Sequence, residues 1–230
     1  MNFDLINQGR QRLTVGVAHV RTSQMRYFDS RDGRLDVRHI MASGALPPAF
    51  PPVRIDGELY WDGGILSYTP TEAVFDDDPR MDSVILSVHL WNPVGAEPTT
   101  MADVFNRHKD VQYSSRIASQ IARHQQAHRL RHVINELASR LPESERNKPE
   151  VGELLGYGCQ TRTHVVQLLA PQLDHEDHTK DIDFSPAGIR RRWEAGYAPT
   201  RAMLAREPCR DRFDPLSGVS FTRPRKSRRT

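Results

Sequence analysis

The sequence is poor in cysteine and lacks both a long apolar run and a secretion signal. Its 230 residues include two cysteines, Cys159 and Cys209, and we expect neither a structural disulfide nor a cysteine-based zinc site from them. No stretch approaches the roughly 18 apolar residues of a membrane-spanning helix. Residues 1–10 also lack the basic and then apolar pattern of a signal peptide. We therefore expect a cytoplasmic location, with peripheral association with a membrane as the alternative.

The excess of charge is small as well. The formal net charge is +3, and the excess of positive charge is concentrated near the C-terminus, between Arg223 and Arg229. Because the rest of the chain is close to neutral, we expect no nucleic-acid partner. A hydrophobic content of 37% and a mean hydropathy of −0.62 predict a modest core under a large solvated surface.

The pattern of apolar residues predicts alternating strands and helices. Strands are predicted over residues 13–22, 24–28, 83–91 and 164–170, with two short ones on either side of Asp56-Gly57. Helices are predicted over residues 37–44, from Thr69 or Thr71 to about 75, over 115–140 and over 186–206, with Asp36 and Ser185 as caps. This order favours an α/β fold. The nearly continuous apolar run at 83–91 predicts a strand covered on both faces.

The segment from Met41 to Pro70 is the most informative part of the chain. Within it, Asp62 ends a predicted strand and is followed by Gly63 and Gly64. Glycines allow a tight turn and a close approach by another group, and ligands of α/β proteins gather at the carboxyl ends of strands. On these three residues alone, however, an ordinary turn is the simpler interpretation.

The wider segment resembles the patatin-like phospholipase family. The resemblance lies in Ala42–Pro47, Ala49–Val53, Ile55-x-Gly57, Tyr60–Gly64 and Pro70. It covers about residues 13–93, while residues 113–142 and 183–205 resemble the C-terminal extension of a bacterial patatin-like subgroup. It implies a partial three-layer fold, with an incomplete central sheet and helices, plus a mainly helical extension. The implied regions are the C-terminal part of a catalytic domain (1–102) and an extension packed on it (103–207). The polar, proline-containing and basic composition of residues 208–230 predicts a basic flexible tail after them.

The resemblance also implies a function. In this family Asp62 would be the base of a serine–aspartate dyad that hydrolyses lipid acyl esters, with Gly63 and Gly64 shaping its turn and no metal or other cofactor. A serine hydroxyl is a poor nucleophile until a positioned base takes its proton. A carboxylate with a reference pKa of about 3.9 is a weak base in water, so a poorly solvated pocket suits it.

The serine itself is missing from the sequence. A G-x-S-x-G elbow needs two glycines four residues apart, and the only such pair, Gly152 and Gly156, encloses Leu154. The segment from Gly156 to Thr161 is a weak match to a phosphate loop, and an ordinary loop is the simpler interpretation. We therefore expect a C-terminal fragment that begins after the serine and is inactive alone. Its expected partners are a lipid or acyl ester substrate of the complete enzyme, with a membrane surface, an N-terminal partner fragment or a second copy left open.

The remaining candidates have simpler interpretations. Residues 174–178 (Asp-His-Glu-Asp-His) are rich in metal-ligand types, but they lack helical periodicity and fit a solvated loop. Packed or hydrogen-bonded strand positions are expected for His19, His89 and His164, and a structural helix end for Ser43. The alternative to a hydrolase is a non-catalytic module that binds a partner or a lipid surface. A nucleic-acid binder would rest only on the basic tail and the arginine-rich helix at 115–140.

Overall fold

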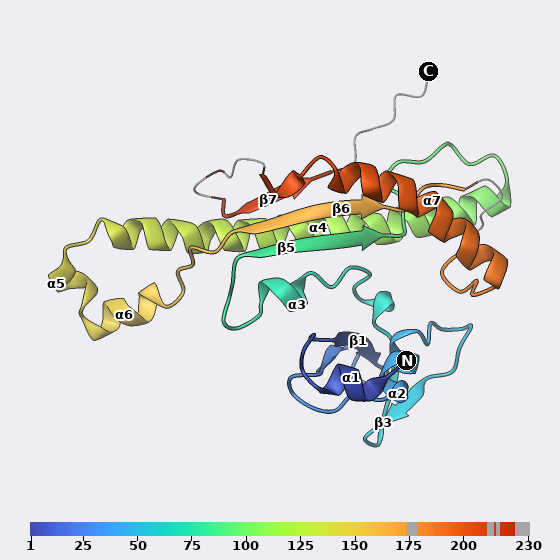
Figure 1. Cartoon of the computed structure of the whole chain (residues 1–230), viewed down its shortest axis with the longest axis horizontal. Helices are drawn as coiled ribbons and strands as arrows, with labels where there is room; N and C mark the ends of the chain where they lie inside the picture. Colours follow the sequence, from blue (N-terminus) through green and yellow to red (C-terminus); the bar gives the residue numbers. More distant parts are fainter. Residues whose placement is uncertain (174–178, 211–213, 215–216, 224–230) are drawn as a thin grey trace. The chain divides into compact units, whose positions relative to one another are not determined.

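Two units make up the chain in the computed structural model, which describes residues 1–173, 179–210, 214 and 217–223. The first unit is Met1–Ala73 and the second is Val74–Thr230. The short helix α3, Glu72–Phe75, crosses the division between them (Figure 1). The region limits predicted at residues 102 and 207 stay predictions. They concern regions of the family's sequence, whereas the two units are defined by contacts within the structure.

The first unit is built on an antiparallel sheet with the strand order β2-β1-β4-β3. Its core contains Val15 and Val17 of β1 with Ile55 and Tyr60 of the neighbouring strands. The helix α2 packs against β1, β3 and β4, and it covers the face on which these side chains lie. The elements are α1 (Phe3–Asn7), β1 (Thr14–His19), β2 (Met25–Asp29), α2 (Val37–Ser43), β3 (Val53–Ile55), β4 (Glu58–Asp62) and the 3₁₀ helix η1 (Gly63–Ile65).

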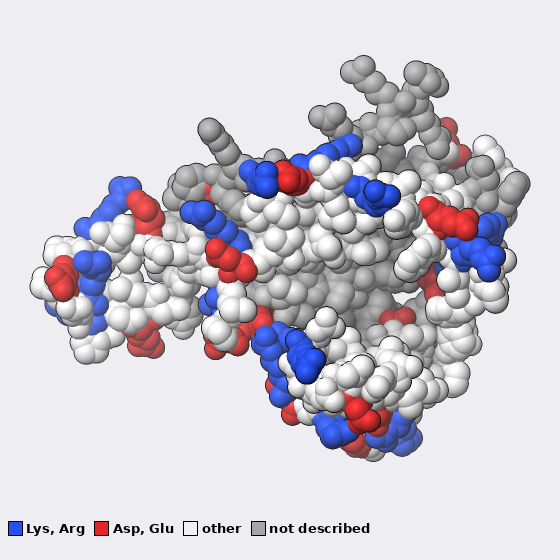
Figure 2. Space-filling model, viewed as in Figure 1, with Lys and Arg blue, Asp and Glu red and all other residues white. Residues whose placement is uncertain are grey.

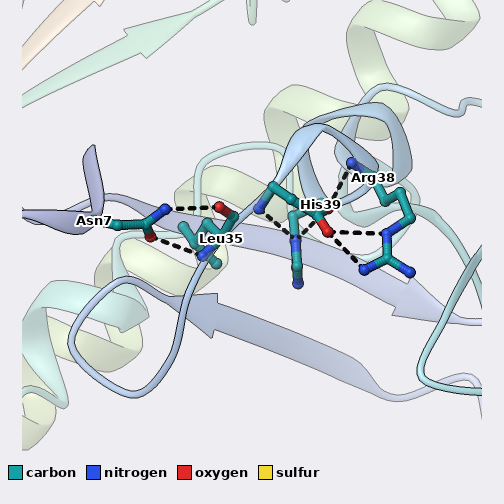
Figure 3. A network of polar contacts seen from close by, with 5 residues as sticks. Asn7, Leu35, Arg38 and His39 are labelled. Carbon is teal, nitrogen blue, oxygen red and sulfur yellow. Dashed lines mark hydrogen bonds and ion pairs between the residues drawn. The ribbon is translucent and has the colours of Figure 1, made fainter. Parts of the chain in front are cut away.

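A network of polar contacts lies at the start of α2 and includes the predicted cap at Asp36 (Figure 3). The Asp36 carboxylate accepts from the backbone N–H of Arg38 at 2.9 Å, and the Asp36 N–H donates to Nδ1 of His39 at 3.0 Å. The side chain of Asn7 makes two hydrogen bonds of 2.9 Å to the backbone of Leu35. The Asn7 contacts tie α1 to the segment before α2.

The second unit contains a parallel sheet with the strand order β5-β6-β7. Each connection between its strands contains a long helix, which makes this unit α/β as predicted (Figure 1). Its core includes Phe75, Val165 and Val219, with Ile85 and Phe221 packed against them. The elements are β5 (Ser83–His89), α4 (Met101–Ser139), α5 (Glu143–Arg146), α6 (Pro149–Leu155), β6 (Thr163–Leu169), α7 (Pro186–Leu204), the 3₁₀ helix η2 (Pro208–Arg210) and β7 (Val219–Thr222).

The helix α4 ends where the sequence predicts but begins 14 residues earlier than the predicted start at 115. Its first turn is closed by a capping box, in which the Thr100 hydroxyl accepts from Asp103 N–H at 3.2 Å and the Asp103 carboxylate accepts from Thr100 N–H at 2.9 Å. The first half of the helix has little apolar periodicity, so the sequence pattern did not reveal it. The capping box supplies the signal that periodicity lacks.

The expectation that β5 is covered on both faces is wrong. Val84, Leu86 and Val88 are 51%, 51% and 67% exposed, whereas Ser87 and His89 are buried. The strand lies at one end of the strand order, and the side chains on its outer face have no covering layer among the described residues of the second unit. An apolar run therefore did not distinguish a central strand from an edge strand.

The prediction of a loose tail from residue 208 onward is wrong for the residues of η2 and β7. The strand β7 pairs in parallel with β6, with Val219 opposite Thr163 and Phe221 opposite Val165. Val219 and Pro208 are buried. The strand is only four residues long and lies among proline and basic residues, so it gave no clear pattern. Residues 224–230 of the predicted tail lie outside the described residues.

Candidate active site

Asp62 is the last residue of β4 and lies at the rim of the first unit's sheet. Its backbone is paired with Val17 of β1, and its N–H donates to the carbonyl of Ala45 at 3.1 Å. Its Oδ1 accepts from the backbone N–H of Gly64 at 2.8 Å. This bond orients the carboxylate over the turn that follows the strand. The sequence prediction of an aspartate at a strand end, before a glycine turn, is therefore realised in the backbone.

The two glycines after Asp62 allow this turn in different ways. A Cβ on Gly63 would lie 2.6 Å from the carbonyl oxygen of Gly16, so the turn contacts the backbone of β1 without room for a side chain. A Cβ on Gly64 would lie 3.1 Å from Asp62 Oδ1. It would crowd the oxygen that accepts the Gly64 hydrogen bond. Gly63 thus permits the close approach between two backbone segments, and Gly64 permits the local hydrogen bond.

An open pocket of about 520 Å³ lies beside this carboxylate, entirely within the first unit. Most of its surface is apolar, and the polar side chains on it are hydroxyl-bearing residues and Asp62 itself. No basic side chain is among the described residues that line it. The lining residues are Leu13, Thr14, Val15, Gly16, Met25, Ile40, Ser43, Gly44, Asp62, Gly63, Gly64, Ser67, Tyr68 and Pro70.

Two serines share the pocket with Asp62. Ser43 is the last residue of α2, at the structural helix end that the sequence predicts. Ser67 was not predicted from the sequence; it is buried, and its N–H donates to the carbonyl of Gly63 at 2.9 Å. Its position three residues after the glycine pair was the only available signal. Neither serine lies between glycines in a G-x-S-x-G pattern.

The three strand histidines are packed and hydrogen-bonded, as expected. His19 contacts Thr22 Oγ1 at 2.9 Å through Nδ1 and Glu58 Oε2 at 3.3 Å through Nε2. His164 Nδ1 lies 2.8 Å from Ser220 Oγ. The ring nitrogens of these histidines thus contact neighbouring side chains within the two sheets, and none of the three histidines lines the pocket.

His89 is the most perturbed of these histidines. Its Nε2 lies 2.7 Å from Ser87 Oγ, and the Gln167 amide donates to its Nδ1 at 3.2 Å. Burial lowers the pKa of His89 to about 4, because the charged imidazolium would lose its hydration inside the unit. The ring is therefore neutral at physiological pH, with the proton on Nε2.

The other predicted candidates do not add to this site. Residues 174–178 lie outside the described residues. In the ranges that are described, no group of three or more histidine, cysteine or acidic side chains is arranged to hold a metal ion. The segment after Gly156 is an ordinary loop that leads from α6 to β6. No helix within the described part of the chain is both long and apolar enough to span a bilayer.

Two family models match the chain, and together they cover both units. A model described as patatin-like phospholipase matches residues 9–75, which include Asp62 and every residue that lines the pocket. A second model, described as patatin phospholipase, matches residues 111–216, from within α4 to beyond η2. No curated protein matches the sequence. The chain therefore belongs to the patatin-like phospholipase family.

Proposed function

We propose that this chain is the aspartate-bearing part of a serine–aspartate lipid acyl hydrolase, with Asp62 as its general base. Lipid acyl ester hydrolysis is the general activity of the family. The observation that carries the proposal is the position of Asp62, which is held by the Gly64 N–H at the edge of a largely apolar pocket. Apolar walls suit an acyl chain, and they make a carboxylate a stronger base than it is in water.

The proposed reaction is a two-step acyl transfer. A serine oxygen attacks the ester carbonyl while its proton passes to Asp62, and that proton then leaves with the alcohol as the C–O bond breaks. Water next attacks the acyl-serine while Asp62 takes a proton from it, and that proton passes to the serine oxygen as the bond between this oxygen and the acyl carbon breaks and the fatty acid leaves. The fixed carboxylate orientation matters because a base must lie within hydrogen-bond reach of the hydroxyl.

The nucleophile is the part of the dyad that these residues do not supply. We propose that a serine in a G-x-S-x-G elbow comes from a segment outside the 230 residues, in the same polypeptide or in a partner, since the sequence contains no such elbow. The 230-residue chain alone is then inactive. Labelling with a fluorophosphonate probe tests this proposal. We expect no modified serine in the chain alone, and Asp62-dependent labelling of Ser43 or Ser67 would overturn it.

A non-catalytic module remains the second candidate. The exposed apolar and basic face of α7, described below, favours a lipid surface as its partner. The two functions differ in the effect of Asp62→Asn. In a hydrolase the substitution abolishes turnover once the serine segment is present, whereas in a binding module it changes neither lipid binding nor partner binding.

A further inference from the structure

The helix α7 carries an exposed apolar stripe far along the chain from the pocket residues. Ile189, Trp193 and Tyr197 are spaced by four residues and are 49%, 74% and 57% exposed. Positions four apart lie above one another on the same side of a helix. The buried residues Gly188 and Met203 face the unit from another side of the helix. A continuous row of this kind on a soluble surface marks an interaction site more often than scattered single residues do.

Basic side chains flank this stripe. The helix contains four arginines and one glutamate, Glu194. Arg190 and Arg201 are exposed and fall on the outer side of the stripe by helical spacing, and the guanidinium of Arg201 lies 5.6 Å from the ring centroid of Tyr197. Arg192 differs from them, because it is partly buried and hydrogen-bonds with Asp183. The exposed face of α7 therefore combines aromatic and aliphatic side chains with a net positive charge.

The position of α7 leaves this face accessible within the second unit. Its amino-terminal half, drawn in orange in Figure 1, extends past the end of the β5-β6-β7 sheet in that view. Figure 2 shows basic and acidic side chains beside uncharged ones at that end of the unit. A flat partner could contact the stripe without displacing Met203, which anchors the helix.

We propose that this face of α7 docks on a bilayer that contains anionic lipids. Tryptophan and tyrosine favour the level of the lipid headgroups, an aliphatic side chain inserts below it, and arginines bind lipid phosphates. A second copy of the chain fits less well. In a two-fold contact the arginines of one stripe would face the same arginines of the other. The inference deepens the proposed function by naming the surface on which the ester substrates are met.

Vesicle co-sedimentation of the 230-residue chain tests this docking surface without any turnover. The probes are phosphatidylcholine vesicles with and without phosphatidylglycerol. We expect binding to the anionic vesicles only, with a blue shift of tryptophan emission that Trp193→Phe removes in large part. Arg190→Gln combined with Arg201→Gln is expected to weaken binding by about 25-fold, since each basic residue near an anionic surface contributes about fivefold.

The matched control is Tyr157→Ser combined with Arg140→Gln. Tyr157 is 66% exposed and the Arg140 side chain is 73% exposed, and both lie toward the α5–α6 end of the unit (Figure 1). All variants keep the basic tail, so a difference between them reports on α7. Trp193→Ser combined with Tyr197→Ser should reduce binding at least tenfold with an unchanged circular dichroism spectrum, whereas the control pair should bind like wild type.

Three results would overturn the inference: no binding to anionic vesicles, equal binding to neutral vesicles, or wild-type binding by the α7 variants. Because the assay measures partition alone, each of these results leaves the role of Asp62 unaffected. If Asp62 proved not to be the base, the expected vesicle binding would be unchanged.

Discussion

Gly63 contacts the backbone of Gly16 so closely that a methyl group on Gly63 would stand 2.6 Å from the Gly16 carbonyl oxygen. This contact joins the turn after β4 to the strand β1. It holds Asp62 at the edge of the pocket, because Asp62 is the residue immediately before the contact. The position of the proposed base thus depends on a glycine that has no chemistry of its own.

Gly63→Ala should therefore destabilise the first unit and displace Asp62. The added Cβ cannot be relieved by a side-chain rotation, since the opposing atoms belong to the backbone, and overpacking of this kind costs about 1–3 kcal/mol. Urea denaturation measures the change in the free energy of unfolding. Gly33→Ala is the matched control, because its Cβ would meet nothing within 4 Å. Equal stability of the two variants would contradict the role given to the contact.

A second prediction concerns the pH dependence of stability from His89. Burial lowers the pKa of His89 to about 4 in the folded chain, against an ordinary value of 6.5. Below 6.5 the unfolded chain binds a proton that the folded chain does not. The free energy of unfolding is therefore highest, as far as His89 is concerned, above pH 6.5, and it falls as the pH falls from 6.5 to about 4. The size of this change is on the order of 3 kcal/mol.

The His89→Gln variant should lack this part of the pH dependence. The test compares the free energy of unfolding of the variant, the wild type and a control between pH 4 and 7. The control is His108→Gln, at an exposed position on α4. The wild type and the control should lose stability in parallel, and the variant should lose less. The assignment to His89 fails if all three show the same slope.

A third prediction concerns the cap of α2. The hydrogen bond from Arg38 lowers the pKa of Asp36 to about 2, so the stabilisation from its ionised form is present above pH 4 and is lost as the pH falls from about 4 to 2. Removing an N-cap costs about 0.5–2 kcal/mol. Asp36→Ala should lower the melting temperature at pH 7, whereas Asp36→Asn should retain most of the capping. An unchanged melting temperature for Asp36→Ala would argue against this cap.

Much of the fold could be predicted where local chemistry decides the structure. Asp36 and Ser185 begin helices as expected, and the turn at Asp56-Gly57 has positive φ values of 50° and 86°, as such a turn requires. The turn after Asp62 was also predicted. In these places one or two residues determine the backbone, and the sequence displays them directly.

The parts that could not be predicted depend on packing between distant segments. Whether Val84 is covered depends on which elements flank β5, and the strand at Val219 is defined by its pairing with β6 more than by its own pattern. The pocket also depends on distant segments, since Met25 precedes the Asp62–Gly64 turn and Ser67 follows it. Periodicity describes one element at a time and carries no information about such neighbours.

The most direct test of the account is hydrolysis of a short-chain nitrophenyl ester by the chain alone and by the chain joined to a serine-bearing amino-terminal segment of a patatin-like phospholipase. We predict no turnover by the chain alone, turnover by the joined protein, and a loss on the order of 10²–10⁴-fold in its Asp62→Asn variant, the range that general-base catalysis contributes. Undiminished turnover by the joined Asp62→Asn variant, or Asp62-dependent turnover by the chain alone, would contradict the account.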